Sequence, residues 1–348
     1  MRIHKECGST MVTMRDIARE AGVSQATVSY ALHNDPSISQ PTRDKVMRAA
    51  QRLNYSINVS ARTLRSGKTN AIGLVLQDIH NPYSTQLADA ISSYANSRGY
   101  QTIIQQTLYE STNEIAILQN IVSSVCDGVI FSPSKLTVKE IQTRLNGKPA
   151  VMLSPIDATH DYDTMLVACE QGIFTATSYL LSRGCKRLLF YCADYADFDD
   201  IKGATDSKWQ RAAGFQRALL RNGITPEPWQ FVPDQPWTRR TARQAIIDTV
   251  RSGLEFDGVV CINDESALGV IRGLADCGLR IPDDVMVTGF DGVEEGEFCV
   301  PELTTVAMDF EDYARQAVDA LIARINGDDS PARDLTAISR LVVRESTR

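Results

Sequence analysis

The chain has 348 residues, of which 43% are hydrophobic and 23% charged, the proportions of an ordinary soluble globular protein. It contains no run of eighteen apolar residues, which excludes a membrane-spanning helix, and the first twelve residues lack the apolar core of a secretory signal. We therefore expect a cytoplasmic protein of two or three domains. The net charge of −7 hides an uneven distribution along the chain.

The charge divides the chain into two parts. Residues 1–68 contain eleven Lys and Arg against five Asp and Glu, a balance of +6, whereas the remaining 280 residues carry −13. A basic segment attracts polyanions such as nucleic acid, and an acidic remainder opposes nonspecific adhesion to them. The alternative is a solvated helical surface with no nucleic-acid partner, and charge alone does not decide between the two.

The cysteines and histidines show no metal-binding or disulfide pattern. Eight cysteines and four histidines are present, but neither a Cys-x-x-Cys nor a His-x-x-x-His pair occurs among them. We expect the cysteines to be reduced and buried, where they act as small apolar side chains. We expect no metal and no cofactor.

Three short helices are predicted in the basic segment. Thr13 and Asp16 have the spacing of a capping box, and an apolar face of helical period follows until a glycine ends the helix. Ser24 is the N-cap of a second helix, and Ser39 begins a third. Three helices with a tight glycine turn between the first two indicate a helix-turn-helix domain, in which the second helix enters the major groove of DNA.

The second helix carries the side chains that we expect to read bases. Its polar side offers Gln25, Ala26, Ser29 and Tyr30, and Gln25 can form two hydrogen bonds with adenine. A three-helix bundle that docks a protein partner would show the same pattern, so that alternative stays open.

A second basic segment follows at residues 54–69. It contains Arg62, Arg65 and Lys68, no acidic residue, and one short stretch that is compatible with a helix. Such a short helix is unstable by itself but could order on DNA, where arginines meet phosphates and Leu64 wedges a base step in the minor groove.

Both segments resemble a known family. The sequence VTMRDIAREAGVSQATVSYALHNDPSISQPTRDKVMRAAQRLNY, followed by NVSARTLRSGKTNAIGLV, resembles the N-terminal signature of the lactose-repressor/galactose-repressor (LacI/GalR) family of bacterial transcription regulators. The similarity continues through the whole chain from about Val12. It implies that the head binds operator DNA, that Gln25 and Ala26 are the specificity pair of the recognition helix, and that Leu64 is the minor-groove lever of a hinge helix.

The chain departs from the family pattern at three positions. Tyr30 stands where several members have arginine, His33 where asparagine is usual, and Ile57 where a proline usually precedes the hinge asparagine. The first two changes bear on the operator sequence. The third makes the start of the hinge less rigid, because proline would have fixed its backbone.

We expect a helix-turn-helix domain at residues 12–57 and a hinge helix with linker at residues 58–70. The side chains expected to contact DNA are Thr13, Ser24, Gln25, Ala26, Thr27, Ser29, Tyr30, His33, Asn58, Ala61, Arg62 and Leu64.

After Thr69, apolar strands alternate with helical patterns. Strands are predicted at residues 71–77, 100–106, 128–133, 187–192, 258–262 and 285–290, and helices near 84–98, 113–125, 209–222, 239–252 and 265–277. Such alternation implies parallel sheets covered on both faces, and Asp127-Gly128 and Asp257-Gly258 repeat one motif in the two parts. We therefore predict an all-α helix-turn-helix head and an α/β body at residues 71–348. The body consists of two doubly wound parallel-sheet subdomains, as in periplasmic binding proteins, and serves in effector binding and dimerisation.

Paired α/β subdomains hold ligands between them, at the carboxyl ends of the strands. The first strand is followed by QDIHNPY instead of Gly-x-Gly-x-x-Gly, so a nicotinamide cofactor is not expected. No nucleophile elbow and no nucleophile with an evident base occurs in the sequence, and we predict no catalytic residues.

Polar and aromatic residues that follow the strands suit a polyhydroxylated small molecule, because charged groups bond hydroxyls and aromatic rings stack on a sugar face. These residues are Asn81, Tyr83, Arg211, Trp237, Asn263, Asp264, Asp291 and Phe310. The family resemblance implies effector contacts in the same segments, QDIHNPYS, QRAAGF, CINDESALG, TGFDGVE and LTTVAMDF. We expect Arg211 and Asp291 to lie on opposite walls of the cleft.

Each of these residues also has a purely structural interpretation. Asn81 could only begin a helix, Asp291 could cap a turn, Arg211 could pair with acids at a helix surface, Trp237 could cover the cleft edge, and Phe310 could belong to the core.

Three further features bear on the effector. Gln171 and Met308 stand where lactose-type members carry other polar groups, so the identity of the sugar does not follow from the resemblance. The acidic loop at residues 193–206 is expected to be solvated, with a preference for a cationic effector as the alternative.

The sequence thus predicts a homodimeric transcription regulator, a repressor, that binds double-stranded operator DNA and responds to a small effector of the carbohydrate class. The end RLVVRESTR has no heptad repeat, which favours a dimer over a tetramer. The alternatives are a sugar- or nucleoside-binding protein whose head docks a protein partner, and an enzyme built on the same body.

Overall fold

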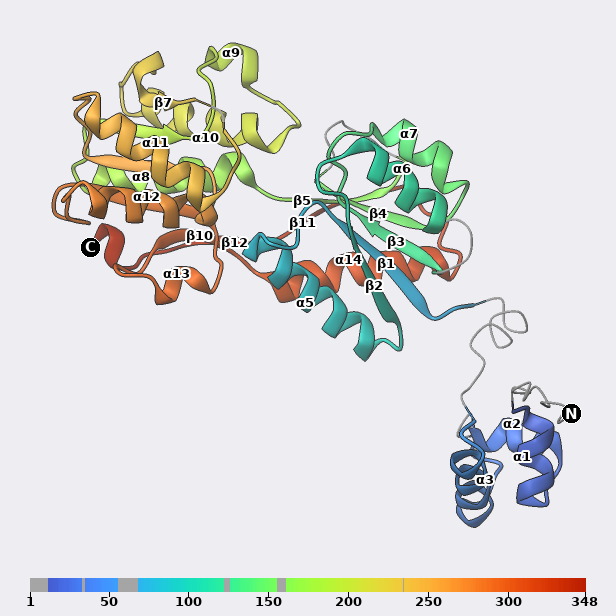
Figure 1. The fold of residues 1–348 in the computed structure, drawn as a ribbon. Helices are drawn as coiled ribbons and strands as arrows, with labels where there is room; N and C mark the ends of the chain where they lie inside the picture. The colour runs from blue at the N-terminus through green and yellow to red at the C-terminus, as the bar shows by residue number, and fades with distance from the viewer. Residues whose placement is uncertain (1–11, 33–34, 56–67, 122–125, 155–160, 234) are drawn as a thin grey trace, which may run out of the picture. The chain divides into compact units, whose positions relative to one another are not determined.

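The structure is a computed structural model that describes residues 12–32, 35–55, 68–121, 126–154, 161–233 and 235–348. The chain divides into two compact units, Met1–Lys68 and Thr69–Arg348, here called the head and the body (Figure 1). Among the described residues, no helix is both long enough and apolar enough to cross a membrane.

The head contains the three predicted helices, α1 (Met14–Ala21), α2 (Gln25–Leu32) and α3 (Gln40–Arg52). The Asp16 carboxylate accepts hydrogen bonds from the Thr13 amide at 3.0 Å and the Thr13 hydroxyl at 2.7 Å, which fixes the start of α1. Gly22 ends α1 at φ +58°, and the Ser24 hydroxyl accepts from the Thr27 amide at 3.1 Å to begin α2. The helices share one small core, formed by Ile17, Ala18, Ala21, Val28, Ala31, Val46, Ala49 and Ala50.

The body contains two six-stranded sheets. The first has the order β11-β5-β4-β3-β1-β2, with β1 (Ala71–Leu76), β2 (Gln101–Gln106), β3 (Gly128–Phe131), β4 (Ala150–Leu153), β5 (Asp163–Leu166) and β11 (Asp334–Thr336). The second has the order β12-β10-β9-β8-β6-β7, with β6 (Leu188–Tyr191), β7 (Phe231–Val232), β8 (Gly258–Cys261), β9 (Met286–Asp291), β10 (Thr304–Met308) and β12 (Ser339–Val342). Neighbouring strands are parallel except for β10 and β12, which are antiparallel.

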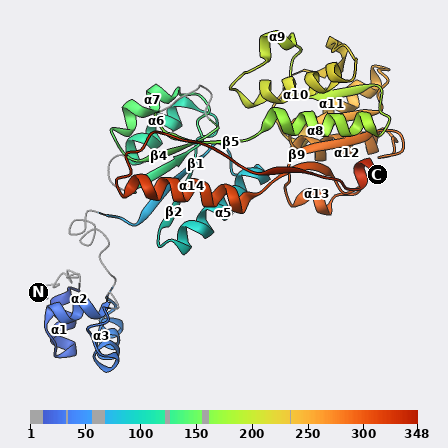
Figure 2. The ribbon, with the colours of Figure 1, turned by 180° about the vertical axis from the view of Figure 1, so that it is seen from behind.

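Helices cover both sheets. The first subdomain has α5 (Pro82–Ser97) packed beside α14 (Phe310–Ile325) on one side of its sheet, and α6 (Ser111–Asn120) and α7 (Val138–Leu145) on the other (Figures 1 and 2). In the second subdomain, α8 (Cys169–Ser182) packs on α10 (Ser207–Arg221), and α11 (Arg239–Arg251) packs on α12 (Asp264–Asp276). Two short helices, α9 (Phe198–Ile201) and α13 (Glu295–Phe298), lie in loops of the second subdomain. The predicted fold class of two doubly wound subdomains is confirmed.

The chain crosses between the subdomains three times. It passes from β5 to α8, from β10 back to α14, and from β11 to β12. The sequence patterns did not reveal β4, β5, α8, β10 or α14, so the crossings were not anticipated. The first sheet therefore combines β1–β5 with the late strand β11, the second combines β6–β10 with β12, and neither subdomain is one consecutive segment of sequence.

The repeated Asp-Gly motif performs the same task in both sheets. The Asp127 carboxylate accepts from the amides of Thr69 and Asn70 at 2.7 and 2.9 Å, just before β1 begins. The Asp257 carboxylate accepts from the amides of Lys186 and Arg187 at 2.7 and 2.9 Å, just before β6 begins. In each subdomain the aspartate thus anchors the entry of the neighbouring parallel strand, which explains the echo in the sequence.

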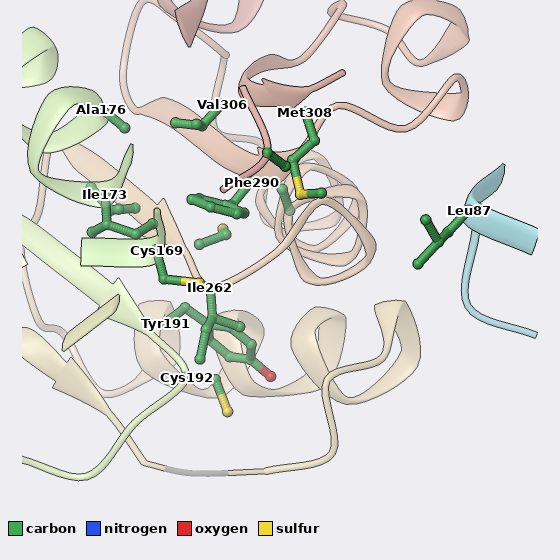
Figure 3. Packing of buried hydrophobic residues seen from close by; sticks show 14 of the residues in the cluster. Leu87, Cys169, Ile173, Ala176, Tyr191, Cys192, Ile262, Phe290, Val306 and Met308 are labelled. Atoms are coloured by element: carbon green, nitrogen blue, oxygen red, sulfur yellow. The ribbon is translucent and has the colours of Figure 1, made fainter. Parts of the chain in front are cut away.

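The core of the second subdomain packs α8 closely on its sheet. Figure 3 shows Cys169, Ile173 and Ala176 of α8 lying along Phe290 and Val306. A Cβ at Gly172 would lie 2.6 Å from the Phe290 ring, so the helix can approach this closely only because Gly172 has no side chain. Of the seven described cysteines, five are buried, as the sequence analysis expected.

Candidate functional site

The outer side of α2 is the candidate DNA-reading surface of the head. Gln25, Ala26 and Tyr30 are exposed, whereas Val28 and Ala31 on the opposite side are buried in the head core. Thr13 and Ser24 are exposed at the starts of α1 and α2, and Thr27 is half-buried. This side therefore offers a short polar row at the start of a helix, the arrangement with which recognition helices meet base edges.

One expected DNA contact does not lie on this exposed side. Ser29 is 9% exposed and packs into the head, because position 29 is on the border between the polar side of α2 and its apolar face. The contact of Ser29 with DNA stays a prediction. The remaining expected contacts, His33, Asn58, Ala61, Arg62 and Leu64, lie outside the described residues.

The other two helices of the head also expose basic side chains. Arg15, Lys45 and Arg48 are exposed on α1 and α3. Exposed guanidinium and ammonium groups of this kind contact DNA phosphates, which fix the position of a recognition helix without reading sequence.

Two of the expected effector residues cap helices. The Asn81 side chain accepts from the Tyr83 amide at 3.0 Å at the start of α5, and the Asn263 side chain accepts from the Ser266 amide at 2.9 Å at the start of α12. Asn81 is half-buried, and Asn263 is only 2% exposed. Asn81 therefore begins a helix, as its structural interpretation proposed. Any ligand contact by Asn81 or Asn263 would use the side-chain NH2 group, because the side-chain oxygen accepts the capping hydrogen bond.

Arg211 and Asp291 form a buried ion pair. They come from α10 and from the end of β9, and Arg211 Nη2 lies 3.7 Å from Asp291 Oδ1. The two residues are 7% and 4% exposed. The expectation of opposite walls was wrong: both residues belong to the second subdomain, because α10 packs on α8 and so returns to the end of the sheet at which β9 terminates.

The ion pair is held in place by aromatic rings and by the backbone. The Arg211 guanidinium carbon lies 4.2 Å from the centre of the Phe290 ring and 5.6 Å from that of the half-buried Trp237. Arg211 Nη1 donates to the Ile262 carbonyl at 2.5 Å. Burial raises the pKa of Asp291, and the Arg211 charge only partly opposes this rise.

Tyr83 and Phe310 contact one another in the first subdomain. Their ring centres, on α5 and α14, are 5.7 Å apart. Burial raises the pKa of Tyr83, and the charge of Asp291 raises it further. The structure thus brings Arg211, Trp237 and Asp291 together in the second subdomain, and Tyr83 and Phe310 together in the first.

Asp264 does not belong to this group of effector candidates. Its carboxylate accepts from the Gly292 amide at 2.7 Å, the Val293 amide at 2.9 Å and the Thr305 hydroxyl at 2.6 Å. These bonds tie the start of α12 to the loop after β9 and to β10. Asp264 is therefore a structural residue, although the sequence motif placed it beside Asn263.

Two neighbours of the ion pair were missed by the sequence analysis. Tyr313 is fully buried on α14, and its pKa is raised by burial and by Tyr83. Cys169 opens α8 and is 2% exposed. Tyr313 follows Phe310 by three positions and so shares its helix face, a signal that was available. Nothing in the sequence around Cys169 indicated its place, because α8 has no capping side chain at its start.

A polar cavity of about 360 Å³ borders Cys169. Gln171, Gln210, Glu170 and Arg217 line it together with the backbone near Gly203. Arg217 bonds the Gln171 side chain at 2.8 Å and pairs with Glu170 at 2.9 Å. The cavity offers polar side chains to hydroxyl-bearing groups, but neither Arg211 nor Asp291 lines it.

The acidic loop at residues 193–206 lies in the second subdomain. Asp194, Asp197, Asp199 and Asp200 are exposed, and Asp206 caps α10 by accepting from the Lys208 amide at 2.9 Å. The loop is therefore solvated over most of its length.

The chain matches two described families. Residues 13–58 match "Bacterial regulatory proteins, lacI family", and residues 177–347 match "Periplasmic binding protein-like domain". Catabolite control protein A from Priestia megaterium is 28% identical over 338 residues, which cover 97% of this chain and 99% of that protein.

Solved structures give the same result. A transcriptional regulator of the LacI family from Sanguibacter keddieii is 30% identical, with a TM-score of 0.71 over 80% of this chain and 98% of that one. The lac repressor dimer bound to operator and the anti-inducer ONPF has the same fold, with 24% identity, a TM-score of 0.81, and coverage of 97% and 99%. The chain therefore belongs to the LacI family of bacterial regulatory proteins and is a DNA-binding transcription regulator.

Proposed function

We propose that the protein is a repressor that binds a specific operator as a homodimer. A small effector that binds in the body lowers or raises the affinity for the operator. The observation that carries the proposal is the pairing of an exposed, polar α2 surface in a basic head with a buried Arg211–Asp291 pair in the body. The first is suited to base edges, and the second to a hydroxylated ligand.

For the head we propose direct reading by Gln25 and Ala26, with Tyr30 and the start of α2 beside them. Gln25 and Ala26 are exposed at the first two positions of the helix, where side chains reach the floor of the major groove. Residues 12–57 form the helix-turn-helix domain and residues 58–70 the hinge in this proposal. We further propose that Leu64 wedges a minor-groove base step when the hinge orders on DNA.

For the body, residues 71–348, we propose a carbohydrate or carbohydrate derivative as the effector. A guanidinium and a carboxylate can each bond ligand hydroxyls, and Trp237, Tyr83 and Phe310 supply rings on which the apolar face of a sugar stacks. Asn81 and Asn263 contribute their remaining amide groups. The operator lies on chromosomal DNA, so we place the working protein in the cytoplasm.

A selection of genomic fragments tests this function. The purified full-length protein is mixed with sheared DNA of its source, and the retained fragments are sequenced. We expect a small set of sites with two-fold symmetry, since a two-fold dimer meets two half-sites. Small molecules handled by the neighbouring genes are then titrated onto the protein–operator complex. Retention of fragments without any shared site would contradict the proposal.

A further inference from the structure

The Asp127 carboxylate binds the chain where the linker to the head joins the body. Thr69 is the first residue of the body and follows the exposed Lys68, with which the head ends. Asp127 accepts hydrogen bonds from the Thr69 amide at 2.7 Å, from the Thr69 hydroxyl at 2.8 Å and from the Asn70 amide at 2.9 Å. Both carboxylate oxygens therefore hold two consecutive residues at the end of the linker.

The neighbouring strands bind the residues that follow Thr69. The Asn70 carbonyl accepts from the Gln101 amide at 2.9 Å at the start of β2, and the Ala71 carbonyl accepts from the Asp127 amide at 2.8 Å just before β3. Among the described residues, the hydrogen bonds of Thr69 go to Asp127 and to its own neighbour Ala71. Asp127 is therefore the group that ties Thr69 to the sheet.

The corresponding aspartate of the second sheet makes the same amide bonds in a different setting. Asp257 accepts from the Lys186 and Arg187 amides at 2.7 and 2.9 Å. The chain before Lys186 is the short connection from the end of α8 at Ser182, so both sides of this bound segment belong to the body. At Asp127, by contrast, the bound segment continues along the chain into the head.

We propose that Asp127 is a positioning residue for operator binding, which fixes the end of each linker on the body and thereby sets the distance that the two heads of a dimer span. Without this carboxylate, Thr69 and the amide of Asn70 are released, and each linker gains roughly 3–7 Å. This length corresponds to about one or two base pairs of DNA. The inference rests on the proposed binding of two half-sites by a homodimer.

A linker with a fixed end makes the spacing of the half-sites matter. After one head binds its half-site, the second head binds from an effective concentration that depends on the length of the linkers and on the point where each leaves the body. One added base pair moves the half-sites about 3.4 Å apart and turns one of them by about 35° around the DNA axis. A longer linker with a loose end tolerates this change better than a shorter one with a fixed end.

The binding of the linker end can be measured in the full-length protein without DNA. Hydrogen exchange followed by mass spectrometry reports the two amides that each aspartate binds, those before β1 and those before β6. We expect Asp127→Ala to speed exchange at the amides before β1 and to spare those before β6. Asp257→Ala is the matched control and should have the reverse effect.

The functional test uses operators in which the spacing of the selected half-sites is shortened or lengthened by up to about two base pairs. We expect the parent to prefer one spacing and Asp127→Ala to reduce this preference about threefold or more, because sites of other spacings come within reach. Asp257→Ala should keep the parental preference, although it loses the same two amide bonds.

An isosteric variant tests the inference if Asp127→Ala does not fold. Asp127→Asn keeps the shape of the side chain and replaces one acceptor oxygen by an NH2 group, so one of the two backbone amides loses its acceptor. We expect it to shift the spacing preference in the same direction by a smaller factor. Asp257→Asn is its matched control.

Three results would overturn the inference and leave the proposed function standing. These are a parental spacing preference in both Asp127 variants, an equal loss of preference in the matched Asp257 variants, and unchanged exchange at the amides before β1 in Asp127→Ala. The second result would assign the effect to a general loosening of the body. A parent that binds DNA without any preferred arrangement of half-sites contradicts the proposed function instead, and the inference with it.

Discussion

Asp264 and Asp291 are both buried in the second subdomain, yet only one of them is suited to a ligand. Burial raises the pKa of each carboxyl. Asp264 accepts three hydrogen bonds from its own chain, including one from the Thr305 hydroxyl at 2.6 Å. Asp291 has the Arg211 guanidinium at 3.7 Å, a distance that leaves acceptor capacity over. A carboxylate with unused acceptor capacity is the one that gains from a ligand hydroxyl.

Asp291→Asn should weaken the effector response and spare operator binding. The change keeps the shape of the side chain but removes the charge, and the loss of a charged hydrogen bond costs about 1.5–3 kcal/mol, or roughly ten- to a hundredfold in effector affinity. The measurement is an effector titration of the protein–operator complex for the parent and the variant. If the variant responds at the parental effector concentration, Asp291 is not an effector contact.

Asp163 allows a pH-dependent prediction at the scale of one residue. Burial opposes its ionisation, but hydrogen bonds from Arg324 and Arg333 lower the pKa of Asp163 to about 2. A carboxyl whose pKa is lower in the folded than in the unfolded state stabilises the fold above the unfolded value, near 3.9, and loses this contribution as the pH falls toward about 2.

Asp163→Asn should therefore lower the free energy of unfolding by about 2 kcal/mol at neutral pH. The difference between the parent and the variant should shrink as the pH is lowered from about 4. Urea unfolding of the parent and the variant at several pH values measures this difference in the free energy of unfolding. An equal difference at pH 7 and pH 3 would show that the effect is not one of ionisation.

At the scale of the elements, α2 shows what capping and hydrophobic periodicity can predict about a helix and what they cannot. Ser24 and the apolar positions Val28 and Ala31 predicted both the start of the helix and its buried face, because capping and periodicity act within one or two turns. Ser29 was expected on the polar side but is only 9% exposed, because it lies on the border between the two faces. Which side a border residue takes depends on how α1 and α3 pack, and this does not follow from α2 alone.

Gln25→Ala should relax the preference for one or two base pairs of the operator, at a cost of about 1–3 kcal/mol, because a bidentate base contact is lost. Lys68→Ala should weaken binding to all sequences about equally, since a phosphate contact carries no sequence information. Binding curves for the selected operator and for single-base variants of it separate these effects. A Gln25→Ala protein with the parental preference at every position would contradict direct reading by this residue.

The packing of α8 on α10 depends on a glycine. A Cβ at Gly214 of α10 would lie 2.3 Å from the Glu170 carbonyl oxygen of α8. Gly214→Ala should therefore force the helices apart and lower the free energy of unfolding by about 1–3 kcal/mol. Gly296→Ala is the matched control, because its Cβ would make ordinary contacts of 3.4 Å or more. Equal urea midpoints for the two variants would show that α8 and α10 are not in close contact.

Physical reasons explain why some elements were not predicted from the sequence. β5 begins with the polar residues Asp163 and Thr164 and so shows no apolar run, and α8 begins after Ala168, which offers no capping side chain. Asp291 lies at the end of β9, as the sequence predicted, whereas Arg211 lies within α10 and Trp237 shortly before α11. That Arg211 and Asp291 pair with one another depends on the return of α10 over α8, a contact between distant segments that no local pattern contains.

At the scale of the whole molecule, the division of charge matches the division of the chain. The head, which ends at Lys68, carries the balance of +6, and the body carries −13. An acidic body is repelled by DNA, so attraction is confined to the head and its exposed basic side chains. Binding to any DNA should then depend on salt through the phosphate contacts of the head, and binding to the operator should add base contacts to this.

The most direct test of the account is the affinity of the full-length protein for its selected operator and for unrelated DNA of equal length, measured from about 50 to 200 mM salt. We expect affinity for both to fall steeply with salt, because each phosphate contact releases roughly one condensed counterion, and the operator to remain preferred by about 10³-fold or more. A flat salt dependence, or equal affinity for the two DNAs, would contradict the account of this chain as an operator-binding regulator.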